Sequence, residues 1–168
     1  MDTHLLIDQI PGLRRYARAL TGDAWAADDL VQDTLERACN KWRLWAVDSD
    51  LRAWLFTLMH NVFANQTRRA PPHATVDVDD IAHELRGADS SRDQHIDLQR
   101  CVLLLPDDQR AILLLIALED LSYAQVAKIL DIPIGTVMSR LSRARSRLHE
   151  LMEGTAPMVN RSGLRRLK

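Results

Sequence analysis

The sequence predicts an all-α protein made of two small helical domains joined by a flexible linker, the second domain ending in a helix-turn-helix. Apolar residues recur at helical spacing through most of the 168 residues, and no stretch alternates convincingly as a β-strand would. Paired prolines, a glycine and acidic residues interrupt this pattern between about Ala70 and Ser91. We therefore expect domains at residues 1–70 and 93–153, a linker at 71–92 and a mobile tail at 154–168.

Three helices can be placed in the first domain from apolar periodicity and capping residues. The first covers about residues 4–20. Asp23 can cap the second, which runs to about residue 40 and has an acidic outward face. Ser49 or Asp50 can cap the third, which covers residues 51–69. The apolar side chains of this third helix that should face inward are Trp54, Leu55, Leu58, Val62 and Phe63.

The second domain opens with a helix from near Asp93 to Leu105. Pro106 then starts another helix, because proline suits the first turn, where its missing N–H is not needed. This helix runs to Leu118 and contains AILLLIAL, which is apolar nearly all round and therefore predicts the central helix of a small bundle. The linker contains one candidate helical turn, at residues 79–86.

The helix-turn-helix is predicted at residues 122–148. Ser122 and Gln125 have the spacing of a capping box at the start of its first helix. Pro133 ends the turn and suits the first position of the second helix. Apolar side chains of that second helix recur at steps of four and three and predict one buried stripe, made of Val137, Leu141, Ala144, Leu148 and Leu151. Arginines lie on a neighbouring face, which favours a helix placed in the DNA major groove over the alternative of a solvated surface.

Charge is segregated along the chain, although the net charge is only −1. From Ile132 to the C-terminus there are eight Lys and Arg against two Asp and Glu. From Asp93 to Asp131 there are three against seven. This asymmetry indicates a basic DNA-facing surface in an otherwise acidic protein.

Several function classes are not indicated by the sequence. It has no glycine-rich phosphate loop and no Cys and His set at metal-ligand spacing, so we expect no enzymatic activity, no cofactor and no metal. No apolar run is long enough to span a membrane, and the N-terminus lacks the pattern of a secretory signal, which favours a cytoplasmic protein without direct membrane insertion. Cys39 and Cys101 are far apart, and we expect both to be buried, reduced thiols.

Three segments carry a resemblance to a known family. They are LTGDAWAADDLVQDTLERA and LRAWLFTLMHNVFANQTRR in the first half, and LPDDQRAILLLIALEDLSYAQVAKILDIPIGTVMSRLSRARSRL in the second. Together they closely resemble the extracytoplasmic-function (ECF) sigma factors of bacterial RNA polymerase, over about residues 5–69 and 93–151. The resemblance implies a protein that binds core RNA polymerase, recognises the −10 and −35 promoter elements and promotes transcription initiation at a specialised regulon.

The resemblance also implies which residues contact the promoter. In the family the recognition helix of the second domain binds the −35 element, and the matching positions are Thr136, Met138, Ser139, Arg140, Arg143 and Arg147. Many members carry a basic residue where this chain has Met138, which implies a different base preference. The first domain captures the −10 element as the duplex melts, and the matching positions are Ser49, Asp50, Asn61, Asn65, Arg68 and Arg69. Trp42 and Trp45 could stack on single-stranded bases, but we favour packing for both.

Partners follow from the same resemblance. The acidic face of the second helix implies docking on the clamp helices of the largest polymerase subunit, and its residues are Asp28, Asp29, Gln32, Asp33 and Glu36. The second domain is expected at the flap of the second-largest subunit. An anti-sigma factor is expected to wedge between the two domains, and no small-molecule substrate is implied. Two alternatives remain, a stand-alone helix-turn-helix transcription regulator and a sigma-like decoy for an anti-sigma factor.

Overall fold

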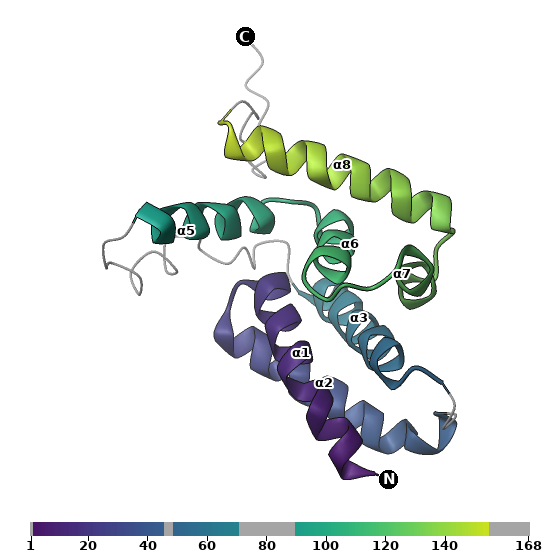
Figure 1. Cartoon of the computed structure of the whole chain (residues 1–168). Coiled ribbons are helices and arrows are strands. Elements are labelled where there is room, and N and C mark those ends of the chain that lie inside the picture. Colours follow the sequence, from purple (N-terminus) through teal and green to yellow (C-terminus); the bar gives the residue numbers. More distant parts are fainter. Residues whose placement is uncertain (1, 46–48, 71–89, 155–168) are drawn as a thin grey trace.

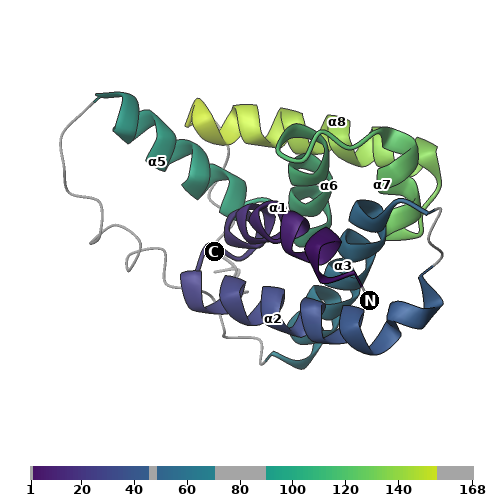
Figure 2. The same ribbon diagram turned by 60° about the horizontal axis from the view of Figure 1, so that its bottom comes forward.

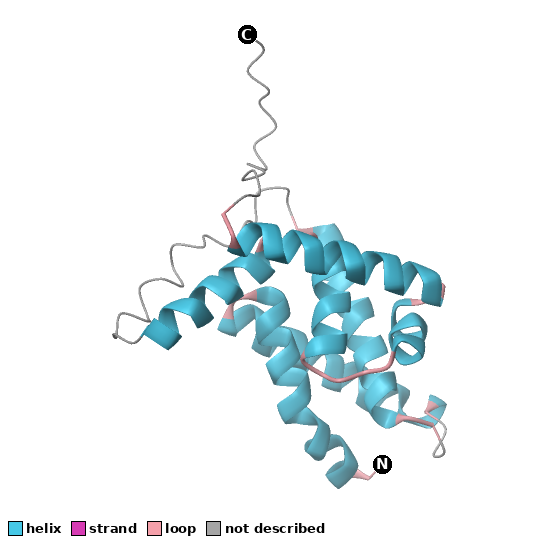
Figure 3. Ribbon diagram, turned by 45° about the horizontal axis from the view of Figure 1, so that its top comes forward, coloured by secondary structure: helices cyan, strands magenta, loops and turns pink. Residues whose placement is uncertain are grey.

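The structure, a computed structural model, describes residues 2–45, 49–70 and 90–154. All regular structure in these residues is helical, and none of them forms a strand, as the sequence predicted (Figure 1, Figure 3). The predicted helical turn at residues 79–86, most of the predicted linker and the tail after Gly154 lie outside the described residues.

Each long helix of the first half begins at an aspartate cap. The bounds are α1 Thr3–Thr21, α2 Ala24–Lys41 and α3 Leu51–Arg69. Asp2, Asp23 and Asp50 precede them, and each carboxylate accepts a backbone N–H of the first turn. Of the two predicted caps for α3, the structure therefore uses Asp50 rather than Ser49. Gly22 ends α1 in the left-handed conformation (φ 71°), which a residue without Cβ adopts at little cost.

The three helices enclose a shared apolar core. Its most buried side chains, each at most 1% exposed, include Leu13, Tyr16, Ala17, Leu20, Leu30, Leu55, Phe56, Met59 and Val62. The rings of Tyr16 and Phe56 meet edge to face, with centroids 5.2 Å apart. The predicted inward residues Trp54 and Phe63 are only partly buried. Both side chains pack against this core without being enclosed by it.

Trp42 and Trp45 pack against each other at the end of α2. Trp42 begins the short 3-10 helix η1 (Trp42–Leu44), and its ring centroid lies 4.9 Å from that of Trp45. Trp42 also meets Trp54 of α3 at 6.4 Å. This arrangement supports the packing role that we favoured over a base-stacking platform. By contrast, Trp25 near the start of α2 is 87% exposed.

The second half is built around α6 (Asp107–Ala117), which packs against α1, α7 and α8. It is preceded by α5 (Ser90–Leu103), which begins before the predicted start at Asp93, and followed by α7 (Tyr123–Leu130) and α8 (Ile134–Met152). All residues from 110 to 115 of α6 are buried, which confirms the predicted central helix. Its N-terminal residues Asp107 and Asp108 suit the positive end of the helix dipole.

The two halves of the chain pack against each other. α1 lies beside α5 and α6, and α3 lies beside α7 (Figure 2). Arg110 of α6 joins the halves, because its Nη1 donates to the Leu20 carbonyl oxygen of α1 at 2.9 Å. Its other guanidinium nitrogens donate to the carbonyl oxygens of Val102, Leu103 and Leu105. One side chain thus donates to carbonyl groups at the C-terminal ends of α1 and α5 and in the turn after α5.

The prediction that both cysteines are buried is wrong. Cys39 is exposed and Cys101 is partly buried, and both are free thiols. Cys39 directly follows the buried Ala38, and one step along a helix rotates a side chain by about 100°, which carries it out of the core-facing stripe. Burial raises the pKa of the Cys101 thiol, and the negative charge of Asp97 raises it further.

Candidate nucleic-acid interface

The helix-turn-helix forms as the sequence predicts. The Ser122 hydroxyl accepts the backbone N–H of Gln125 at 3.2 Å, and the Gln125 side-chain oxygen accepts the backbone N–H of Ser122 at 2.9 Å. These two bonds complete the capping box at the start of α7. Asp131 ends α7 in the left-handed conformation (φ 53°), and Pro133 directly precedes α8. The turn places α8 along the top edge of the molecule in Figure 1, packed against α5, α6 and α7.

One face of α8 is open to solvent. Val137, Leu141 and Ala144 face the core and are at most 2% exposed. Residues two or five positions away point to the other side, because successive side chains are rotated by about 100°. From Met138 to the last turn of the helix, the exposed residues are Met138, Ser139, Ser142, Arg143, Arg145 and Ser146. Three of the six predicted −35 residues, Met138, Ser139 and Arg143, therefore lie on this open face.

The other three predicted −35 residues, Thr136, Arg140 and Arg147, are partly buried. Arg140 Nε lies 3.6 Å from Asp108 Oδ2 of α6, in an ion pair whose two side chains are 33% and 52% exposed. Such an exposed pair is worth about 0–1 kcal/mol, so it would not prevent Arg140 from leaving Asp108 to bind a phosphate group of DNA.

Two serines belong to the same surface and were missed by sequence reasoning. Ser142 and Ser146 line a shallow hollow beside α6, together with Arg143 and Arg147. Each lies three residues after an exposed residue that was predicted, Ser139 in one case and Arg143 in the other. That spacing places them on the same helix face and was the signal that could have found them.

The predicted −10 residues are spread along α3 and are not brought together. Ser49 and Asp50 precede the helix, whereas Asn61, Asn65, Arg68 and Arg69 belong to its second half. A helix of 19 residues is about 28 Å long, so the two groups lie near opposite ends. Asn61, Arg68 and Arg69 are exposed, and Asn65 is partly buried.

Asp50 has two roles in the structure. Its Oδ1 accepts the backbone N–H of Ala53 at 3.1 Å and so caps α3. Its Oδ2 accepts the side-chain N–H of Gln125 at 2.8 Å. Gln125 is the capping-box residue of α7, so a predicted −10 residue of the first half is bound by the helix-turn-helix of the second.

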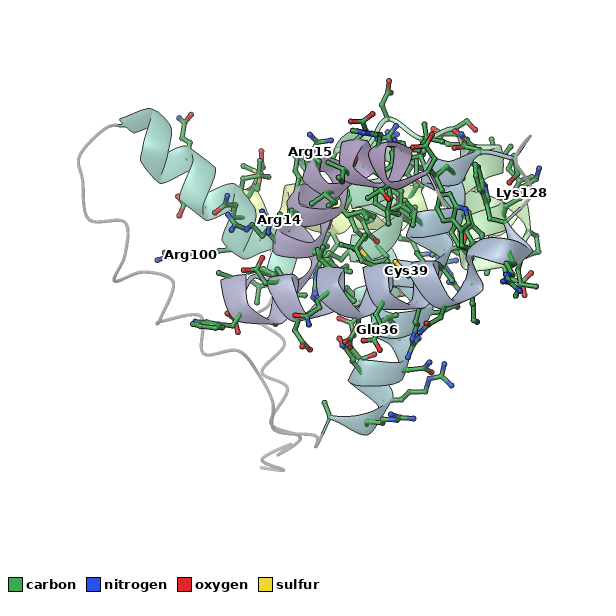
Figure 4. All side chains as sticks on the ribbon, turned by 90° about the horizontal axis from the view of Figure 1, so that it is seen from below. Arg14, Arg15, Glu36, Cys39, Arg100 and Lys128 are labelled. Carbon is green, nitrogen blue, oxygen red and sulfur yellow. The ribbon has the colours of Figure 1, made fainter. Side chains whose placement is uncertain are left out.

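The acidic side chains of α2 form an exposed stripe. Asp28, Asp29, Gln32 and Glu36 are exposed, and Figure 4 shows Glu36 on the side of α2 away from α1. Asp33 is partly buried against α3, and its Oδ2 accepts the side-chain N–H of Gln66 at 3.0 Å. The structure therefore gives Asp33 a role in joining α2 to α3, which the sequence did not indicate.

Sequence reasoning missed the charged residues that join the two halves. Glu119, in the turn after α6, is 1% exposed, and its carboxylate accepts hydrogen bonds from Arg15 of α1 and Arg52 of α3. These partners are 104 and 67 positions away in the sequence. The only local signal was a carboxylate placed directly after an apolar run.

The described part of the chain contains neither a candidate metal site nor a candidate membrane-spanning helix. There, no three His, Cys, Asp or Glu side chains are grouped so that they could hold a metal ion. None of the helices built from these residues is long and apolar enough to cross a membrane.

Burial alone lowers the pKa of His60, and burial together with the charge of Glu119 raises the pKa of Tyr16.

Comparison with known proteins gives one family match for each half and several relatives that span both. Residues 6–60 match the family described as the Sigma2 domain of PhyR, and residues 95–148 match Sigma-70, region 4. The ECF RNA polymerase sigma factor EcfG of Rhodopseudomonas palustris is 35% identical over 150 residues, which cover 88% of this chain and 82% of that protein. The ECF RNA polymerase sigma factor SigM of Mycobacterium tuberculosis is 31% identical over 140 residues, which cover 83% and 71%.

Solved structures agree with this placement. The sigma factor RpoE of Bartonella quintana, in complex with the anti-sigma factor NepR, superposes with a TM-score of 0.72 at 33% identity and covers 90% of this chain and 96% of that one. CnrH in complex with the cytosolic domain of CnrY superposes with a TM-score of 0.69 over 92% of this chain and 88% of that one. At 22% identity, this second likeness shows a shared fold.

Proposed function

The chain belongs to the extracytoplasmic-function sigma factors of bacterial RNA polymerase, and on that premise we propose that it binds the core enzyme and carries it to promoters that it reads with both halves. In this proposal residues 1–70 bind core polymerase and the −10 element, residues 93–153 bind the −35 element, and 71–92 link them. One observation carries it: both sigma regions occur in order in a chain that matches a sigma factor over 88% of its length. A stand-alone regulator would account for the second region only.

The −35 element is read by the open face of α8. Arg143 is exposed there, and a guanidinium can bond guanine through two parallel hydrogen bonds, worth about 1–3 kcal/mol of discrimination. Thr136 and Ser139 lie near the helix N-terminus, where hydroxyl groups and backbone N–H groups suit phosphate oxygens. Met138 is 52% exposed on this face, so that position contributes an apolar contact. Arg140 and Arg147 add charge from the flank.

The −10 element is read by α3 and the residues before it. Asn61 and Asn65 carry amides that can both donate to and accept from a base edge. Arg68 and Arg69 end the helix and suit the phosphate backbone. Ser49 and Asp50 lie at the opposite end of α3, so the captured DNA strand would lie along the length of this helix. A decoy that only titrates an anti-sigma factor has no need of these exposed groups.

The acidic stripe of α2 docks on the clamp helices of the largest polymerase subunit, and the second half contacts the flap of the second-largest subunit. Asp28, Asp29, Gln32 and Glu36 are exposed as this requires. Negative charge on this face would repel DNA, which favours a protein partner. RNA synthesis itself is catalysed by the core enzyme, and the protein acts in the cytoplasm with it.

Run-off transcription with purified core polymerase tests the proposal. The wild-type chain should give a promoter-dependent transcript, and Arg143→Ala should lower the yield about 5- to 100-fold through weaker −35 binding, with core binding unchanged. Arg14→Ala, which removes an exposed arginine of α1, is the matched control and should behave as wild type. Operator binding without any transcript would instead support a stand-alone regulator.

A second pair of substitutions tests the acidic stripe. Asp29→Lys with Glu36→Lys should abolish binding to core polymerase in a pull-down, since both residues are exposed and contribute to the same stripe. Asp33 is unsuitable for this purpose, because its loss would also break the bond to Gln66. If the Arg143 variant lost core binding as fully as this pair did, our assignment of roles would be wrong.

Control by an anti-sigma factor is part of the proposal. The RpoE neighbour was solved with NepR bound, and its superposition covers both halves of this chain at once. An inhibitor that covered the acidic stripe of α2 would block the surface assigned above to polymerase. Size-exclusion chromatography of the full chain with a candidate encoded beside it should give a complex that no longer binds core polymerase. A candidate that elutes separately is excluded.

A further inference from the structure

Two large apolar side chains are exposed at the start of α8. Ile134 is 49% exposed and Met138 is 52% exposed, and neither belongs to the apolar core formed by the described residues or packs against it. They are four residues apart, so their side chains differ in direction by only about 40° and lie on one flank of the helix. We call these two residues the apolar pair. Figure 1 shows this end of α8 at the outer corner of the molecule, beside α7.

The helix end that carries the apolar pair is open. An added Cβ at Gly135, the residue after Ile134, would meet nothing within 4 Å. Pro133 at the N-cap position makes no side-chain hydrogen bond, so the N–H groups of the first turn are available to a phosphate oxygen. In a helix-turn-helix, the N-terminal residues of the second helix contact base edges in the major groove. The apolar pair therefore lies where base contacts are made.

The surroundings of the apolar pair favour DNA over a protein partner. The exposed residues around it on α8 are polar, and they include Ser139, Ser142 and Arg145. The centre of a protein interface is apolar and poor in charge, and each partner buries about 800 Å², far more than two side chains provide. DNA recognition instead combines phosphate contacts from charged and hydroxyl groups with small apolar contacts to bases. The base that offers such a contact is thymine, whose C5 methyl group lies in the major groove.

The apolar pair and Arg143 lie on different flanks of the open face. Arg143 is five residues after Met138, which rotates its side chain by about 140° from that of Met138. A guanidinium suits the O6 and N7 atoms of guanine, whereas an aliphatic side chain suits a methyl group. Ile134 and Met138 are about 6 Å apart along the helix axis, close to two base-pair steps of about 3.4 Å. One helix can thus read thymine with one flank and guanine with the other.

We propose that Ile134 and Met138 read thymine in the −35 element through contact with its C5 methyl group, and that they restrict the promoters that this sigma factor accepts. The inference rests on the proposed function, because it names the bases read by the helix assigned there to the −35 element. It predicts one or two thymines in that element, within about two base pairs of each other.

Replacing thymine by deoxyuridine tests the contact, because this change removes the methyl group and keeps every hydrogen-bonding group of the base. Holoenzyme assembled from core polymerase and the full chain first selects its preferred sequences from duplexes randomised over both promoter elements. Each −35 thymine is then replaced singly, and affinity is measured by fluorescence anisotropy. At one or two positions the affinity should fall about fourfold, which corresponds to about 0.8 kcal/mol for one buried methyl group.

Methylated cytosine gives an independent measurement of the same contact. 5-Methylcytosine carries its methyl group at the C5 position, as thymine does. At the thymine positions that respond to deoxyuridine, a duplex with 5-methylcytosine should therefore bind about fourfold more tightly than a duplex with cytosine. The hydrogen-bonding groups are the same in both duplexes, so the comparison again isolates the methyl group.

Substitutions in the chain connect this effect to the apolar pair. Met138→Gln keeps the length of the side chain and removes its apolar end, so one thymine should no longer respond to loss of its methyl group. Ile134→Ala should weaken the response at the same or the neighbouring thymine. Met138→Leu should retain it. Ile7→Ala removes a similarly exposed apolar side chain (51%) from α1, and this matched control should behave as wild type.

The inference is wrong if no −35 thymine responds to deoxyuridine in the wild-type holoenzyme, or if Met138→Gln and Ile134→Ala both keep the full response. It is also wrong if these two variants lose binding to core polymerase, since the apolar pair would then face a protein. Failure of the proposed function would be distinct, because the wild-type holoenzyme would select no −35 sequence at all. Loss of the methyl response alone leaves promoter selection intact.

Discussion

Replacing Arg110 by methionine should destabilise the whole chain, because this one guanidinium pairs four backbone carbonyl groups. Its bonds to the Leu20 and Leu105 oxygens, at 2.9 and 2.8 Å, are buried. Its bonds to the Val102 and Leu103 oxygens, at 3.2 and 2.9 Å, are partly buried. Methionine fills a similar volume, so the change removes donors and charge while largely preserving the packing.

The expected loss follows from those four bonds. Each of the two buried carbonyls left without a donor costs about 1–3 kcal/mol, whereas the two partly buried ones can recover water at a smaller cost of about 0.5 kcal/mol each. Removing a buried charge returns part of this, because the guanidinium no longer has to be desolvated. The sum is a loss of about 3–5 kcal/mol in the free energy of unfolding, against a total of about 5–15 kcal/mol for a domain.

Urea denaturation followed by circular dichroism measures this loss. With a slope of about 2 kcal/mol per molar urea, the midpoint of Arg110→Met should fall by about 1.5–2.5 M. Arg110→Lys keeps the charge without the planar fork and should lose about half as much. Arg14→Met, at an exposed position of α1, should stay within about 0.5 kcal/mol of wild type. A midpoint for Arg110→Met within 0.3 M of wild type, about 0.6 kcal/mol, would refute the reasoning.

Two further predictions concern the first half and its boundary. Gly22→Ala should lower stability by about 1–3 kcal/mol, since Gly22 has φ 71° and an added Cβ would lie 2.6 Å from a methyl carbon of Leu103. Gly135→Ala, where nothing lies within 4 Å, should instead be neutral or stabilise by up to about 1 kcal/mol; equal melting temperatures for the two variants would contradict the packing described. Burial lowers the pKa of His60 below its usual 6.5, so the unfolded chain binds a proton there first, and stability should fall as pH drops below 6.5. His60→Gln should flatten this slope in urea titrations at pH 5 to 7, and an unchanged slope would assign the proton to another group.

Local signals in the sequence predicted most of the fold. Asp50, the Ser122–Gln125 pair and Pro133 act within one helical turn, and each begins a helix where expected. The contacts between the halves were not predicted, because Arg15 and Glu119 meet across 104 positions. Helical periodicity assigns a residue to a face but does not say which distant element will cover it.

The candidate site was predicted unevenly for the same reason. The open face of α8 followed from the spacing of its buried stripe, and Met138, Ser139 and Arg143 lie there. Arg140 faces Asp108 of α6, a partner that periodicity of α8 alone cannot reveal. Asp33 likewise looked like one member of an acidic stripe until its bond to α3 became visible.

The exposed indole of Trp25 gives this protein a built-in spectroscopic reporter. Trp42, Trp45 and Trp54 form a cluster in which excitation can pass from ring to ring, whereas Trp25 stands in water one turn before Asp28 and Asp29. Its emission should therefore be the red-shifted and readily quenched part of the spectrum. Any partner that binds the acidic stripe of α2 would exclude water from this ring. The Trp25 emission should then shift to the blue and become less sensitive to iodide, so assembly could be followed without an added label.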